Sequence, residues 1–272
     1  MFKAEAWAAL FRDYRVFTNG LLATIEMALV GFVIAMLLGI VFGLFATCGK
    51  KPLMLVNRVY VEFFQNTPLM LQALFLFYGV TFSGNRSFTP LVAGMIALGI
   101  YHGAYFSEVI RSGIEAVPRG QFEAAYAQGF TYLQSMQFVV VPQTIKIVLP
   151  PMVNQIVALI KNTSCMLLVG GAVDLISATN AYAVGASTAR YGPAAYVFSG
   201  ILFFAVCFPL SMLASRWEEQ LKRRDQNTQT VKLLRATPDQ VSDAELDEML
   251  QEISGQNMPP DETGGTAEGG DR

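Results

Sequence analysis

An uncharged stretch near the start of the chain decides its fold. From Met27 to Cys48 the sequence reads MALVGFVIAMLLGIVFGLFATC and contains no charged side chain. An α-helix needs about 20 apolar residues to cross the roughly 30 Å hydrocarbon layer of a membrane, and this stretch is long enough. Similar stretches follow at Phe63 to Asn85, Ser87 to Ser107 and Tyr191 to Ser215. The pattern predicts an all-α protein that crosses a membrane repeatedly.

The overall composition supports a membrane setting. Of 272 residues, 53% are hydrophobic and 15% are charged, and the mean hydropathy is +0.41. A water-soluble domain carries about a quarter charged residues. Cys48, Cys165 and Cys207 lie in or beside apolar stretches without metal-ligand spacing, so we interpret them as small core residues. The sequence predicts no metal site, no catalytic residue and no nucleic-acid partner.

Five spanning helices fit the chain best. The spacing of Gly39 and Gly43 favours close packing of the first span on another helix. Pro68 is expected to kink or restart the second span, and Pro142, Pro150 and Pro151 to act as breakers ahead of the fourth. The expected spans cover approximately residues 21–47, 68–82, 91–110, 144–168 and 194–214.

Basic residues orient these spans. The connecting segments 48–60, 111–146 and 216–224 together hold ten lysines and arginines, and the opposite side holds five. Because basic residues accumulate in cytoplasmic loops, this places the N-terminus outside and the C-terminus in the cytoplasm. The expected divisions are an extracytoplasmic segment at 1–17, the membrane domain at 18–224 and a cytoplasmic tail at 225–272.

Charge is concentrated in that tail. The formal net charge of the chain is −2, yet residues 225–272 alone carry eleven acidic and three basic side chains. The tail has few aromatic residues and a glycine-rich end, a composition typical of disorder. Within it, the stretch from Ser242 to Glu245 could cap a short helix.

A polar loop between the third and fourth spans is the best guide to function. From Pro118 it reads PRGQFEAAYAQG. Gly120 precedes a short helical run, in which Ala124, Ala125 and Gly129 present little side-chain bulk. Ala125 and Gly129 are expected on one face, at i and i+4. A helix bared in this way can lie close against a partner protein.

Two further residues define this loop. We expect Glu123 in the first helical turn, where a carboxylate interacts favourably with the helix dipole. Pro142 fixes how the chain re-enters the membrane. The alternative on composition alone is an ordinary connecting loop with a frayed helix.

The loop also carries a resemblance to a known family. Glu123-Ala124-Ala125, Gly129 four residues later and Val139-x-Val141-Pro142 resemble the signature of permease subunits of bacterial ABC importers. Valines replace the usual isoleucine and leucine. Blocks at residues 60–69, 108–114 and 161–164 are similar to the polar amino-acid subfamily, and the resemblance covers roughly residues 18–224.

The resemblance implies a division of labour in a type I importer. This chain forms half of a dimeric pore in the bacterial cytoplasmic membrane, surrounded by lipid, with a second permease that is either a copy or a paralogue. A separate ATP-binding subunit docks on the loop, and an external binding protein delivers the substrate. The chain holds no GxxxxGK[ST] phosphate loop, so ATP and Mg²⁺ are expected to be used by the partner. The coupling residues carried over are Gly120, Glu123, Ala124, Ala125, Gly129 and Pro142.

A second candidate site lies in the fourth span. Lys161 stands in an apolar context, and an ionisable residue at membrane depth indicates function by default. It could receive a substrate carboxylate in a water-filled cavity; alternatively it snorkels to the interface or pairs with an acid. Because Gln155 is neutral, glutamine- or glutamate-like substrates are favoured over cationic ones. The candidate substrate path comprises Lys161, Asn154, Gln155, Thr163 and Ser164.

Several alternatives remain open from the residues. Glu108 with Arg111 and Arg58 with Glu62 have helical spacing for ion pairs, and a gate contact is the sharper alternative for the first pair. A membrane enzyme using His102, Glu108 and Lys161 and a passive channel are the rival functions. Within transport, an importer of another small polar solute competes with the amino-acid permease.

Overall fold

The computed structural model describes residues 4–84, 87–170 and 174–235, and these residues contain helices and no strand. The chain divides into a compact unit, Met1–Trp217, and a second unit, Glu218–Arg272. Of the second unit, residues 218–235 are described, as the last part of a long helix. The expected short helix at Ser242 and the tail beyond residue 235 lie outside the described residues.

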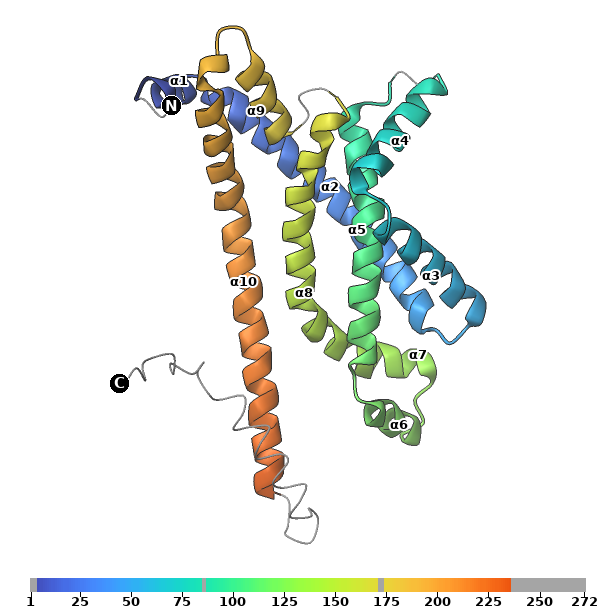
Figure 1. Cartoon of the computed structure of the whole chain (residues 1–272). Helices are drawn as coiled ribbons and strands as arrows, with labels where there is room; N and C mark the ends of the chain where they lie inside the picture. Colours follow the sequence, from blue (N-terminus) through green and yellow to red (C-terminus); the bar gives the residue numbers. More distant parts are fainter. Residues whose placement is uncertain (1–3, 85–86, 171–173, 236–272) are drawn as a thin grey trace, which may run out of the picture. The chain divides into compact units, whose positions relative to one another are not determined.

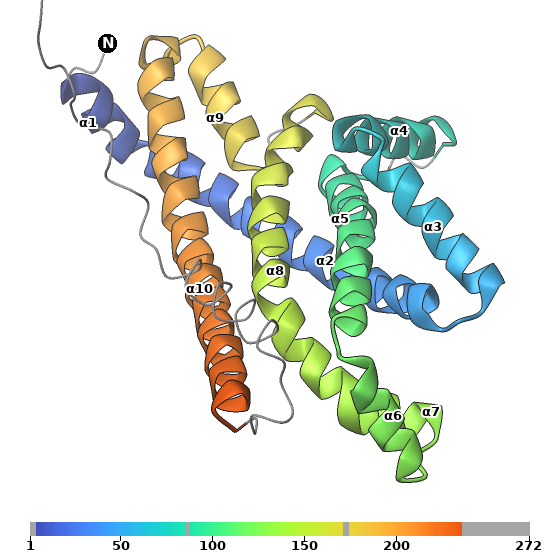
Figure 2. The same ribbon diagram turned by 60° about the horizontal axis from the view of Figure 1, so that its bottom comes forward.

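Two long helices form the centre of the first unit. α2 (Tyr14–Thr47) crosses α5 (Pro90–Glu115) obliquely, and the two are in contact over much of their length (Figures 1 and 2). The crossing depends on small residues: a Cβ on Gly39 would lie 2.5 Å from Cβ of Phe106, and one on Gly43 would lie 2.9 Å from Cγ2 of Ile110. The predicted use of this glycine pair in close helix packing is confirmed.

The second expected span begins with a separate helix. α3 (Lys51–Gln65) ends before Pro68, which caps α4 (Leu69–Phe82), so the predicted restart at Pro68 is confirmed. α3 packs on the end of α2 and on α5. There the Tyr60 hydroxyl donates to the carbonyl of Ile100 at 2.7 Å.

The chain turns sharply after α5. α6 (Arg119–Ala127) and α7 (Tyr132–Ser135) lead into a π-helix, η1 (Met136–Val140), which continues as α8 (Val141–Asn162) and a 3₁₀ helix, η2 (Thr163–Leu168). Pro142 lies in the first turn of α8, but Pro150 and Pro151 lie inside this helix. The expectation that all three act as breakers was therefore wrong. A spanning helix tolerates prolines where the freed carbonyl groups find other partners.

Three shorter elements that were not expected gather at the opposite end of the unit from α6 and α7 (Figures 1 and 2). They are α1 (Ala4–Arg12), α9 (Leu175–Val184) and a 3₁₀ turn, η3 (Ala189–Tyr191), which precedes α10 (Gly192–Arg235). Phe17 is fully buried there and packs against Tyr182 and Phe198. We call this region, α1, α9 and the adjoining starts of α2 and α10, the far cap.

Three helical segments of the described chain are long and apolar enough to cross a membrane. They are Tyr14–Thr47, Tyr132–Leu168 and Ala189–Leu221, and they contain the first, fourth and fifth expected spans. α4 coincides with the second expected span but is shorter than these three segments. α5 covers the third expected span and is not one of the three. The number of five crossings stays a prediction.

Candidate coupling elbow and substrate groove

The polar loop folds as a bent unit, residues 119–140, which we call the elbow. Pro118 occupies the N-cap position, so α6 already begins at Arg119. Gly120 therefore lies inside the first turn, and Glu123 lies beyond it. The prediction that Glu123 occupies the first turn was wrong, because a proline at the cap starts the helix earlier than the glycine suggested. Glu123 and Ala124 are exposed, and Ala125 is buried.

Gly129 ends α6 instead of extending it. Its φ is +84°, a left-handed conformation in which a side chain is strained. The amide of Phe130 donates to the carbonyl of Ala125 at 3.0 Å, and the amide of Gly129 donates to that of Tyr126 at 2.9 Å. These two bonds define a Schellman cap. Gly129 is thus outside the helix and does not share a face with Ala125, contrary to the prediction.

The N-terminus of the next helix, α7, also has a hydrogen-bonded cap. The Thr131 hydroxyl accepts from the amide of Gln134, and the Gln134 side chain accepts from the amide of Thr131 at 2.9 Å, forming a capping box. Two capped ends thus lie on either side of a short link, so the elbow has a defined backbone and the frayed-loop alternative fails.

An apolar joint fixes the elbow to the membrane helices. Its buried members come from the end of α5, the turn that follows it and η1, and the half-buried Phe122 of α6 packs against them. α6 is therefore packed both against the end of α5 and against η1, which continues as α8. The joint consists of Ile114, Val117, Phe122, Met136 and Val140.

Pro142 explains the π-helix that precedes α8. Without an N–H group, proline cannot donate to the residue four positions earlier, and its ring crowds that carbonyl. The amide of Val141 instead bonds the carbonyl of Met136, five residues back. The Gln143 side chain donates to the carbonyl of Val139 at 2.9 Å and satisfies it. The bend between elbow and span is therefore encoded by the proline.

A groove between α5 and α8 is the best candidate for a substrate path. Its volume is about 570 Å³, and Gln155 is the predicted path residue that lines it. Lys161 and Asn154 are exposed on α8 but are not among the lining residues. The other polar lining side chains are Gln65, Tyr105, Glu108 and Ser112.

The hydroxyl groups of η2 are already used. Thr163 donates to the carbonyl of Ile160, and Ser164 donates to that of Lys161, both at 2.8 Å. A residue that the sequence reasoning missed is Asn162, whose amide nitrogen lies 3.1 Å from Nε2 of the buried His102. The i, i+7 spacing of Asn162 from Gln155 could have indicated it, because this spacing puts both amides on one side of α8.

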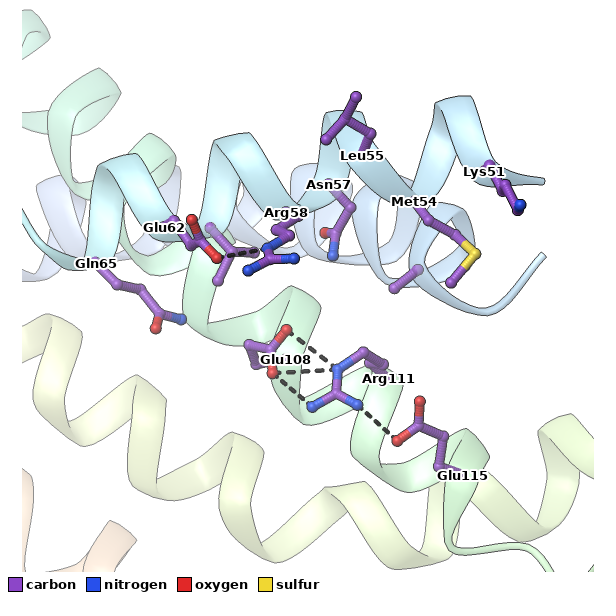
Figure 3. A pocket seen from close by; sticks show the side chains of 12 residues that line it. Lys51, Met54, Leu55, Asn57, Arg58, Glu62, Gln65, Glu108, Arg111 and Glu115 are labelled. Carbon is purple, nitrogen blue, oxygen red and sulfur yellow. Dashed lines mark hydrogen bonds and ion pairs between the residues drawn. The ribbon is translucent and has the colours of Figure 1, made fainter. Parts of the chain in front are cut away.

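The predicted ion pairs are present and border a second cavity (Figure 3). Arg111 contacts Glu108 at 2.8 Å, and Arg58 contacts Glu62 at 2.7 Å, as expected from their spacing. Arg111 also binds Glu115 at 2.6 Å, which was not foreseen. Its hydrogen bonds, chiefly to Glu108, raise the pKa of the Arg111 guanidinium above its ordinary value.

No cluster of three potential metal ligands occurs in the part of the chain that the structure describes. The three cysteines are free thiols.

Long apolar helices joined by a bent polar connection are features of a helical membrane protein. The pattern of the family described as "Binding-protein-dependent transport system inner membrane component" matches residues 35–224. The chain is 34% identical over 214 residues to the probable glutamine ABC transporter permease protein GlnM of Bacillus subtilis (strain 168), covering 79% of this chain and 97% of the relative. It is 30% identical over 211 residues to the L-cystine transport system permease protein TcyB of the same organism, covering 76% and 87%.

A solved structure agrees with these relatives. The chain matches the crystal structure of an amino acid ABC transporter with histidines at a TM-score of 0.71 and 30% identity, covering 78% of this chain and 97% of that one. The chain therefore belongs to the family of binding-protein-dependent transport system inner membrane components. The predicted family, the amino-acid permeases of ABC importers, is confirmed, and with it the all-α fold and a transport role without enzymatic activity. The family works in the bacterial inner membrane with an ATPase and a substrate-binding protein.

Proposed function

We propose that this chain is half of the pore of an importer for polar amino acids, with glutamine- or glutamate-like substrates favoured. A neutral amide, Gln155, faces the groove between α5 and α8. The one carboxylate in the groove lining, Glu108, is paired with Arg111. The name of the relative GlnM supports glutamine, whereas that of TcyB refers to cystine. Identifying the ligand of the binding protein that copurifies with the complex tests this assignment; a sugar or an inorganic ion there contradicts it.

We further propose that the elbow receives force from a separate ATPase, which binds ATP and Mg²⁺. This places the elbow in the cytoplasm and the far cap outside, where a binding protein delivers substrate to this chain and a second permease, either a copy or a paralogue. The observation that carries the proposal is the joint: α6 exposes a small-residue face while Phe122 on its other side is packed against α5 and η1. The coupling residues proposed are Gly120, Glu123, Ala124, Ala125, Gly129 and Pro142.

Enlarging the docking face tests this role directly. In Ala124→Trp the indole ring projects from an exposed position, so the membrane domain should fold normally while the ATPase subunit no longer docks. We expect at least a tenfold loss of copurifying ATPase, equivalent to about 1.4 kcal/mol of binding free energy. Ala186→Trp, at an exposed alanine in the turn that follows α9, is the matched control and should retain the ATPase. Normal recovery of the ATPase with Ala124→Trp contradicts the docking role.

The substrate path is proposed to include Lys161, Asn154, Gln155, Thr163 and Ser164, with Lys161 receiving the substrate carboxylate. Lys161→Ala should lower uptake several-fold while the ATPase subunit still assembles, because its exposed side chain supports no packing. Uptake by reconstituted complexes measures this, with Gln155→Ala as a companion from the groove. Uptake kinetics equal to those of the wild type in Lys161→Ala remove this residue from the path.

A further inference from the structure

The charged cavity beside α3 shares Gln65 and Glu108 with the substrate groove, but the proposals above assign no ligand to it. Its volume is about 610 Å³, and it lies between the end of α2, one face of α3 and α5 (Figure 3). Charges of both signs face it in equal number, so it favours neither a simple anion nor a simple cation. The charged lining residues are Lys51, Arg58, Glu62, Glu108, Arg111 and Glu115.

Some of these charges are already satisfied and others remain available. Arg111 is held by Glu108 and Glu115. Arg58 uses its Nε to bind one oxygen of Glu62, which leaves its two terminal nitrogens for another acceptor. Lys51 takes part in no ion pair within residues 4–235, as far as these are described. The cavity thus offers cationic donors on α3 and spare carboxylate oxygens nearby.

A buried amide adds a fixed donor. Asn57 is 5% exposed, and its Oδ1 accepts a hydrogen bond of 2.7 Å from the hydroxyl of Ser107. This bond orients the amide, and Figure 3 shows the side chain directed into the cavity. The amide nitrogen of Asn57 is a donor and can bind an oxygen of a phosphate group.

An apolar stripe adjoins the charged lining. Leu55 borders the cavity, and Val56, Val59 and Phe63 continue along α3; all four are at least half exposed. A small soluble zwitterion leaves this stripe uncovered. A molecule with a zwitterionic headgroup and hydrocarbon chains covers both the charged lining and the apolar stripe. An amphipathic helix in the membrane interface likewise contacts headgroups with one face and acyl chains with the other.

We propose that the cavity binds the phosphoethanolamine headgroup of a phospholipid. Its phosphate lies near Lys51, Arg58 and Asn57, and its ammonium lies near the spare oxygen of Glu115. The acyl chains follow the stripe of α3. The ammonium matters because its three N–H groups donate to carboxylates, which the trimethylammonium of phosphatidylcholine is unable to do. The proposal does not depend on which solute is transported.

Lipid retention by the complete transporter tests the site. The complex is placed in bilayer discs of equimolar phosphatidylethanolamine, phosphatidylcholine and phosphatidylglycerol, then moved to detergent, and retained lipids are counted by native mass spectrometry. The wild type should retain phosphatidylethanolamine preferentially. Lys51→Gln and Glu115→Gln should each reduce that preference roughly two- to fivefold, the effect of a partly exposed charge pair. Lys50→Gln, at a neighbouring lysine that does not line the cavity, should leave it unchanged.

Four outcomes overturn the proposal. Equal retention of phosphatidylethanolamine and phosphatidylcholine removes the role of the ammonium, and preference for phosphatidylglycerol indicates an anion site. An effect of Lys50→Gln equal to that of Lys51→Gln indicates unspecific surface attraction. Displacement of the retained lipid by free glutamine identifies a site for soluble amino acids instead.

Discussion

The two ends of the first unit are stabilised in different ways. In the far cap, buried side chains hydrogen-bond across elements: Thr24 accepts from the amide of Leu175 at 2.9 Å, and Thr179 pairs with Ser199. The elbow is held by backbone caps and an apolar joint, and it leaves one face of α6 bare. A network of satisfied polar groups fixes one geometry by itself, whereas a bare helix face is completed by a partner. The difference indicates that the elbow is the end built for docking.

The largest effect should come from the cap of α6. In Gly129→Val a β-branched side chain is forced to φ near +84°, at a cost of about 1–3 kcal/mol, although the space around the position is open. The Schellman cap should break and uptake should be lost, while membrane insertion is retained. Gly129→Asn is the matched variant, because asparagine tolerates this conformation. Uptake is the measurement, and equal uptake by both variants contradicts a conformational role for Gly129.

A smaller effect is expected in the far cap. The Asp174 carboxylate caps α9 by accepting from the amides of Ile176 and Ser177, both at 3.1 Å. Asp174→Ala should lower the free energy of unfolding by about 1–2 kcal/mol, the usual value of an N-cap. The thermal midpoint in detergent measures the loss, and an unchanged midpoint contradicts the capping role.

The same residue gives a pH dependence. Burial raises the pKa of the Asp174 carboxyl above its ordinary value. The folded protein then holds this proton more tightly than the unfolded chain, so the stabilisation is present below the ordinary pKa and is lost as the pH rises through the raised pKa. Asp174→Asn keeps an acceptor and does not titrate, so it should lack this component of the pH profile. A profile identical to that of the wild type contradicts the assignment.

The smallest effect is expected at the ion pair on α3. Arg58 and Glu62 are largely exposed, and such pairs contribute roughly 0.2–1 kcal/mol or less. Glu62→Gln should therefore shift the thermal midpoint by no more than the pair's small contribution. A loss as large as that of Asp174→Ala shows that the pair has a structural role beyond its surface contact.

The sequence predicted the parts that depend on composition and local spacing. Uncharged runs located the long apolar helices, Pro68 located the restart of α4, and helical spacing located the Arg58 and Arg111 pairs. Conformations that depend on backbone geometry were missed. Gly129 does not lie on the predicted helix face, because i, i+4 spacing does not reveal a positive φ. Pro150 and Pro151 lie inside α8 and do not end it, contrary to what their sequence positions alone predict.

The sequence did not show which side of α8 lines the groove; this follows from the fold. The sequence indicated Lys161 because it is a charged residue in an apolar span. In the structure the groove is lined by Gln155, and Asn162, next to Lys161, contacts His102. A rotation of about 100° separates consecutive helix residues. The packing of α8 on α5, and not the sequence of α8, therefore selects the polar residues that meet there.

Crosslinking from the elbow tests the central claim most directly. A single cysteine at position 124 is placed in a chain whose Cys48, Cys165 and Cys207 have been replaced by serine, and a matched cysteine is placed at position 186. We expect position 124 to crosslink to the ATPase subunit of the assembled transporter and position 186 not to. An assembled complex that shows no crosslink from position 124, or one from position 186, contradicts the account.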